Sequence, residues 1–214
     1  MFDSVALSAA VVAGDPDKVK AETASLLEAG VPPKDIIEQG LIPAMDVVGE
    51  KFQEGEVFIP DILFSARAMS EALATLRPLL SEKETVASGR VVLGTVKGDV
   101  HDIGKKLVGM MLEGAGFEVT DLGSDVAPSA FVEAVKEKRP HIVGLSALLT
   151  TTMGQMKNTI DALAESGLRD DVKVMIGGAA VSEEYATQIG ADAHGPDATV
   201  AVELARKFMA ELSA

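Results

Sequence analysis

The sequence contains no cysteine and no tryptophan, and it has a single tyrosine. Without cysteine the chain can form no disulfide, no thiolate metal site and no iron–sulfur cluster. This composition is compatible with a reducing cytoplasm, which is the expected location. The N-terminus has no basic segment ahead of its apolar residues, so it does not resemble a signal peptide. No apolar run reaches the length of a membrane span, and no membrane association is expected.

Basic residues are also scarce, with 19 Lys and Arg against 33 Asp and Glu and a formal net charge of -14. An acidic surface repels phosphate backbones, so a nucleic-acid partner is not expected. The charge can serve solubility, or it can form an acidic docking face for basic patches on partner proteins. The chain is 214 residues long and 47% hydrophobic, which is enough for one large domain or two small ones.

Residues 1–81 carry helical signals and no convincing strand. Asp15-Pro16 and Pro32-Pro33 are typical of helix starts. After the second start, apolar residues recur at spacings of three and four, at Ile37, Leu41, Met45, Val48 and Phe52. Gly40 and Pro43 interrupt this stripe and predict a kink or a break. A further helix is predicted from about residue 60 to residue 80, and the segment is therefore interpreted as a four-helix bundle.

A polar segment at 82–89 ends in glycine and is the predicted linker. Residues 90–214 then alternate strand and helix. The predicted strands are 90–96, 118–121, 141–146, 172–176 and 191–194, and the predicted helices are 103–115, 128–138, 152–166, 181–189 and 197–212. This alternation predicts an α/β fold with a doubly wound, parallel, five-stranded sheet of the flavodoxin-like (Rossmann-like) type. In such a sheet ligands bind outside the carboxyl ends of the strands.

Three polar or glycine-containing loops follow predicted strands and should meet at that edge. The first contains Asp99, His101 and Gly104, the second begins Ser146-Ala147-Leu148, and the third contains Gly177-Gly178. Each loop alone is a weak signal, because a lone loop histidine is more often structural and a Gly-Gly pair often marks a helix entry. Taken together without regard to spacing, the loops would suggest phosphate or nucleotide binding.

The order and spacing of Asp-x-His-x-x-Gly, Ser-x-Leu and Gly-Gly resemble the cobalamin-binding fold of cobalamin-dependent methionine synthase and of corrinoid proteins in methyltransferase systems. The segment 52–60, FQEGEVFIP, resembles a turn of the helical cap domain in these families, and Ser65-Ala66-Arg67-Ala68-Met69 resembles the helix after it. The resemblance covers nearly the whole chain, and the length suggests a free-standing carrier protein.

The resemblance implies that the corrinoid binds in a base-off/His-on mode, with His101 as the lower ligand of cobalt. Imidazole is a neutral nitrogen donor suited to this role. Asp99 would accept a hydrogen bond from the other ring nitrogen and raise the basicity of the ligand. Thr152 aligns with a serine that completes this catalytic relay in methionine synthase. The alternative for Thr152 is a structural role at the start of the next helix.

The remaining cofactor-binding residues are also implied by the resemblance. In the lower domain they are Asp102, Ile103, Gly104, Ser146, Leu148, Thr150, Gly177 and Gly178. Gly104 would leave room for the nucleotide tail of the corrinoid, and the Gly-Gly pair would let backbone approach it. In the cap, Phe52, Phe58, Ile59 and Ile62 would cover the upper corrin face and exclude water, or they would simply be core of the bundle.

The implied function is a methyl carrier that alternates between cob(I)alamin and methylcobalamin. It would accept a methyl group from a substrate-specific methyltransferase and pass it to a second one that uses a folate or thiol acceptor, with a reductive activase as a further partner. The chain would be the non-catalytic subunit of such a system. The alternatives are the cobalamin-binding subunit of an adenosylcobalamin-dependent mutase, a cobalamin-dependent light-sensing regulator, and a flavodoxin-like receiver without a corrin.

Overall fold

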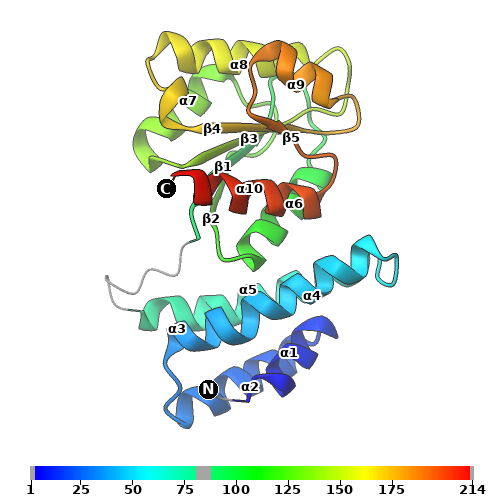
Figure 1. Ribbon diagram of the computed structural model, residues 1–214, viewed down its shortest axis with the longest axis vertical. Helices are drawn as coiled ribbons and strands as arrows, with labels where there is room; N and C mark the ends of the chain where they lie inside the picture. The colour runs from blue at the N-terminus through cyan, green and yellow to red at the C-terminus, as the bar shows by residue number, and fades with distance from the viewer. Residues whose placement is uncertain (1–2, 81–87, 213–214) are drawn as a thin grey trace. The chain divides into compact units, whose positions relative to one another are not determined.

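The computed structural model describes residues 3–80 and 88–212 of the chain (Figure 1). These residues form two compact units, a helical one at the N-terminus and a second one that begins at Ser88. The linker predicted at 82–89 lies outside the described residues up to residue 87. Within the described residues, no helix combines the length and apolar character needed to cross a membrane.

The N-terminal unit consists of helices, as predicted. Its elements are α1 (Val5–Val12), α2 (Pro16–Glu28), α3 (Pro33–Ile36), the π-helical η1 (Ile37–Leu41), α4 (Ile42–Gln53), α5 (Ile59–Leu76) and the 3-10 turn η2 (Arg77–Leu79). Both predicted helix starts are confirmed, and the Asp15 carboxylate caps α2 by accepting a hydrogen bond from the Lys18 backbone N–H. The elements α3, η1 and α4 follow one another without a break and form one long helix. Together with α1, α2 and α5 this makes the four helices of the predicted bundle.

The interruption predicted at Gly40 and Pro43 takes the form of a wider helical turn. In a regular α-helix the ring of Pro43 would clash with the carbonyl group of Gln39. The π-helical segment η1 ends two residues before this proline, so the helix continues through the site. Four of the five residues on the predicted stripe are buried, namely Ile37, Leu41, Met45 and Val48, whereas Phe52 is only partly buried.

The C-terminal unit is a five-stranded parallel sheet with helices on both faces, which confirms the predicted fold class. The strands are β1 (Arg90–Thr95), β2 (Glu118–Asp121), β3 (Ile142–Ser146), β4 (Lys173–Gly177) and β5 (Ala193–His194). They lie in the order β2-β1-β3-β4-β5, which is the flavodoxin-like order. The helices are α6 (Ile103–Gly114), α7 (Pro128–Lys138), α8 (Gly154–Glu165), α9 (Glu183–Ile189) and α10 (Ala198–Leu212), with a 3-10 turn η3 (Arg169–Asp171).

Figure 1 shows α7, α8 and α9 on one face of the sheet and α6 and α10 on the other. The core under α7, α8 and α9 includes Phe131, Leu145, Met156 and Ile176, all fully or almost fully buried. Because both faces are covered, the central strands are continuous apolar runs. This explains why the sequence predicts β1, β3 and β4 as strands.

Candidate functional site

The carboxyl ends of three central strands lie in register. Thr95 at the end of β1 pairs with Ser146 at the end of β3, and Ser146 pairs with Gly177 at the end of β4. The loops that follow these strands therefore leave the sheet at the same level. This brings the Asp99–His101 segment beside the Leu148–Thr152 segment, as predicted from the strand order.

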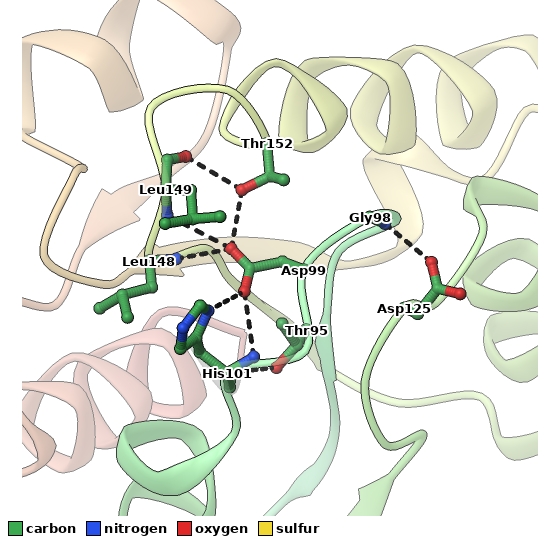
Figure 2. A network of polar contacts seen from close by, with 8 residues as sticks. All are labelled: Thr95, Gly98, Asp99, His101, Asp125, Leu148, Leu149 and Thr152. Carbon is green, nitrogen blue, oxygen red and sulfur yellow. Dashed lines mark hydrogen bonds and ion pairs between the residues drawn. The ribbon is translucent and has the colours of Figure 1, made fainter.

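The Asp99 carboxylate is the centre of a hydrogen-bond network between these two loops (Figure 2). Its Oδ1 atom accepts bonds from the His101 backbone N–H at 3.0 Å and faces the His101 Nδ1 atom at 2.8 Å. Its Oδ2 atom accepts bonds from the backbone N–H groups of Leu148 at 2.9 Å and Leu149 at 3.3 Å, and from the Thr152 hydroxyl at 2.7 Å. Five donor groups therefore lie within hydrogen-bond distance of this carboxylate.

The Asp99 side chain is completely buried. Burial on its own would raise the pKa of the Asp99 carboxyl, because it penalises the charged form. The hydrogen bonds from Thr152, His101 and Leu148 outweigh burial and hold the pKa of Asp99 well below its ordinary value. Asp99 is thus a fixed negative charge beside the imidazole at neutral pH.

The His101 imidazole lies at the edge of the network and reaches solvent. Its side chain is 47% exposed, and its Nδ1 atom is occupied by Asp99. The contact with an ionised carboxylate favours the tautomer in which Nδ1 carries the proton. Nε2 is then the basic nitrogen, and within the described part of the chain it has no hydrogen-bond partner. The backbone of His101 is also held in place, because the buried Thr95 hydroxyl donates a hydrogen bond to the His101 carbonyl at 3.0 Å.

Thr152 joins the network through its hydroxyl group, as the resemblance implied. The side chain is buried, and Oγ1 lies 2.7 Å from Asp99 Oδ2 and 2.9 Å from the Leu149 carbonyl oxygen. Both neighbours are acceptors, and a hydroxyl has one proton, so Thr152 can donate to only one of them at a time. Thr152 precedes α8 by two residues, and its part in a relay remains a prediction that this contact supports.

Several other predicted cofactor-binding residues surround His101. Ile103 and Leu148 are exposed apolar side chains, and Thr150 is exposed. Asp102 forms an ion pair with Lys106 at 2.6 Å on the first turn of α6. At Gly104, the second residue of α6, a Cβ atom would meet nothing within 4 Å, so the space above this glycine is open.

Gly177 and Gly178 have a packing role that is independent of any ligand. A Cβ at Gly177 would lie 2.8 Å from the Gly195 carbonyl oxygen, and one at Gly178 would overlap the Ala147 carbonyl. Gly178 also has a φ angle of +122°, which favours glycine. Their approach to a nucleotide tail stays a prediction.

The four predicted cap residues belong to the helical unit and differ in exposure. Phe58 is 67% and Ile59 is 47% exposed, Phe52 is partly buried, and Ile62 is completely buried. Phe58 and Ile59 stand at the start of α5, where apolar side chains this exposed are available to a ligand. The role of all four residues over a corrin ring remains a prediction.

The sequence analysis missed four residues that the structure places at this site. Thr95 supports the His101 backbone, and Val100 and Leu149 add exposed apolar side chains to the two loops. Asp125, in the loop after β2, accepts a bond from the Gly98 N–H at 2.8 Å. Val100 and Leu149 could have been predicted from their positions inside the two loops. The sequence around Asp125 contains no motif that would have identified it.

Two family models match the chain, and each is described as a B12 binding domain. One covers residues 89–204 and the other covers residues 5–77. The two matches correspond to the α/β unit and the helical unit.

Relatives match over the length of both units. A corrinoid protein of Desulfitobacterium hafniense (strain Y51) is 42% identical over 206 residues, which is 95% of this chain and 95% of that protein. The dimethylamine corrinoid protein of Methanosarcina barkeri is 46% identical over 83% of this chain and 84% of its own length. The crystal structure of the methanol:cobalamin methyltransferase complex of Methanosarcina barkeri matches with a TM-score of 0.88 and 33% identity, over 96% of this chain and 78% of that chain. This chain therefore belongs to the family of cobalamin-binding corrinoid proteins of methyltransferase systems.

Proposed function

We propose that the protein carries a methyl group on a corrinoid whose cobalt is held from below by His101. The observation that carries this proposal is the half-exposed imidazole, with Nδ1 on a buried carboxylate and Nε2 free to bind a metal. A bound corrinoid supplies a cobalt centre that can accept a methyl group and give it up again. The protein supplies the ligand, its orientation and the polar environment.

The residues present fit such a group. A corrin ring would supply most ligands of its own metal, so the imidazole of His101 would be enough as the ligand from the protein. Exposed apolar side chains flank His101, with Val100 69% and Ile103 78% exposed, and they offer a surface for the apolar edge of the macrocycle. The open space at Gly104 supports the predicted path of the nucleotide tail.

The hydrogen-bond network supports one defined tautomer of His101. With Nε2 as the ligand of a metal, Nδ1 would keep its proton and hold it in the hydrogen bond to Asp99 Oδ1. We therefore propose that Asp99 fixes the orientation and tautomer of the imidazole in which Nε2 is available to a metal.

The names of the relatives favour a methyl carrier over the alternatives. Corrinoid proteins for trimethylamine and dimethylamine are more than 40% identical to this chain. A similar chain occurs in a complex named as a methanol:cobalamin methyltransferase. We infer that this chain docks a substrate-specific methyltransferase, and that a second methyltransferase and a reductive activase act on it. The mutase alternative is less favoured, because a matched helical domain precedes the α/β unit.

The ligand can be tested with the protein reconstituted with hydroxocobalamin and reduced to the cobalt(II) state. In the wild type, ¹⁵N-labelled histidine should change the nitrogen splitting in the EPR spectrum, because the axial nitrogen comes from the protein. His101→Ala should still bind the corrinoid but lose this sensitivity to the label. If the splitting in the wild type does not respond to the label, the axial nitrogen comes from the benzimidazole of the cofactor, and the proposal is refuted.

The carrier function needs a separate test. The protein loaded with methylcobalamin should lose its methyl group to a thiol acceptor when a partner methyltransferase is added, and loading with adenosylcobalamin should support no turnover with any mutase partner. Methyl transfer that is absent with every methylamine or methanol methyltransferase tried, together with activity in a mutase assay, would contradict it.

A further inference from the structure

Asp125 contacts three consecutive residues of the loop that leads to His101. Its backbone N–H donates to the Asp99 carbonyl at 2.8 Å, and its Oδ1 atom accepts from the Gly98 N–H at 2.8 Å. Its carboxylate also pairs with the Lys97 ammonium group at 3.0 Å. Figure 2 shows Asp125 on the opposite side of this loop from Leu148, Leu149 and Thr152. The Asp99 segment is therefore held from two sides by two different loops.

The backbone at Asp125 is in the left-handed region, which glycine adopts freely and which aspartate tolerates better than most other residues. Its φ angle is +56°, and among the described residues only Arg139 shares a positive φ without being glycine. An aspartate in the left-handed region costs free energy that surrounding contacts must offset. A glycine at this position would remove the strain but also the acceptor for Gly98. What aspartate provides at this position, and glycine would not, is the carboxylate that accepts the Gly98 N–H.

Gly98 explains why this acceptor matters. Its φ angle is +82°, in a region that a glycine can leave at little cost. It immediately precedes Asp99, whose carboxylate sets the position and tautomer of the His101 ring. A rotation of the Gly98 peptide would carry Asp99 with it, and a shift of about half an ångström is enough to weaken a site of this kind.

We propose that Asp125 is a positioning residue that fixes the Gly98–Asp99 backbone and thereby strengthens the bond between His101 and cobalt. This inference rests on the proposed function, because it requires His101 to be the lower ligand. The bond from Gly98 N–H to the carboxylate carries the effect. The pair with Lys97 contributes little, because the two side chains are 52% and 48% exposed and solvent screens their attraction.

Four variants separate the contributions. Asp125→Gly removes the acceptor and relieves the backbone strain, so the fold should be retained while the loop is loosened. Asp125→Asn keeps an oxygen acceptor and tolerates the left-handed conformation. Lys97→Met removes only the ion pair. Arg139→Gly is the matched control, because it relieves the other strained residue at the end of α7, away from the site.

The readout is the fraction of cobalt(II) corrinoid with a histidine nitrogen ligand, from EPR, together with the cobalt(II)/cobalt(I) midpoint potential. Asp125→Gly should shift the balance toward the ligand-free form by about three- to tenfold, as expected for the loss of one solvent-exposed hydrogen bond of ordinary strength. Asp125→Asn should recover most of the ligated form, and Lys97→Met and Arg139→Gly should match the wild type. In a His101→Ala background, Asp125→Gly should change neither quantity.

The outcomes separate the two proposals. If His101→Ala leaves the spectrum and the potential unchanged, the proposed function fails. If His101→Ala changes both but Asp125→Gly leaves the ligated fraction at the wild-type level, only the role of Asp125 is refuted. An equal loss of ligation in Asp125→Gly and Arg139→Gly would also refute it, because the effect would then follow from backbone replacement in general.

Discussion

Gly104 offers a test in which protein stability and cofactor binding should move in different directions. It is the second residue of α6, and a Cβ atom built on it meets no other atom within 4 Å. Glycine is a poor helix former, so Gly104→Ala should leave the free energy of unfolding of the cofactor-free protein unchanged or raise it by up to about 1 kcal/mol. Nothing in residues 3–80 and 88–212 therefore requires glycine at this position.

If the nucleotide tail passes over Gly104, the added methyl group will occupy space that the tail needs. Overpacking by one methyl group typically costs about 1–3 kcal/mol, which corresponds to a dissociation constant about five- to 150-fold higher. The assay is a spectroscopic titration with hydroxocobalamin, with urea unfolding of the cofactor-free protein in parallel.

Gly154 provides the matched control for this substitution. It is also exposed at the start of a helix, α8, and a Cβ there also meets nothing within 4 Å. Gly154→Ala should have the same small effect on stability and no effect on cobalamin binding. Wild-type affinity in Gly104→Ala, or an equal loss of affinity in both variants, would show that the tail does not run over Gly104.

Three further predictions follow from buried or strained groups in the α/β unit. In Asp99→Asn, an amide NH2 group replaces a carboxylate oxygen that accepts hydrogen bonds in the wild type, so donor faces donor. The free energy of unfolding of the cofactor-free protein, measured in urea, should fall by about 2–4 kcal/mol. A loss below about 0.5 kcal/mol would contradict the network. Burial, and secondarily Arg90, lower the pKa of His141, whose Nδ1 accepts the Arg90 N–H. The unfolded chain then binds the proton first, so the contribution of His141 to stability is complete above pH ~6.5 and is lost as pH falls. His141→Asn, which keeps an acceptor, should flatten this dependence in urea unfolding at a series of pH values, and an unchanged slope would rule it out. Gly178→Ala should destabilise the protein by about 3 kcal/mol or more, because of its positive φ and the nearby Ala147 carbonyl, and thermal unfolding like that of the wild type would be inconsistent with this packing.

The sequence predicted the sheet well because its signal is burial. The central strands are covered on both faces, so their apolar runs are distinct, and predicted and observed bounds differ by one residue. Predicted and observed strand ends differ where a residue is buried but does not take part in regular strand pairing. Val96 is completely buried, but it makes only an isolated bridge with Val126, and β1 ends before it. The strand predicted at 191–194 shrinks to Ala193–His194, because the Asp192 side chain accepts the Val174 N–H that a longer ladder would use.

The candidate site divides in the same way. Asp99 and His101 could be named because a spaced motif contains them, and Thr152 because the family resemblance implies a hydroxyl there. The structure brings the three side chains together. Asp125 could not, because its contacts with Gly98 and Asp99 depend on a left-handed backbone and on the pairing of two loops across the sheet edge. Neither property leaves a pattern in the amino-acid order around residue 125.

The network also indicates which part of the site moves when the proposed ligand is exchanged. Asp99 is completely buried and receives five bonds from two loops, so any displacement of its carboxylate would break several of them at once. The His101 ring is 47% exposed and is held by a single bond through Nδ1. Rotation of the ring therefore costs one hydrogen bond, whereas movement of the carboxylate costs several. If His101 is the proposed ligand, we expect its ring to move when the ligand is exchanged while the Asp99 carboxylate keeps its place.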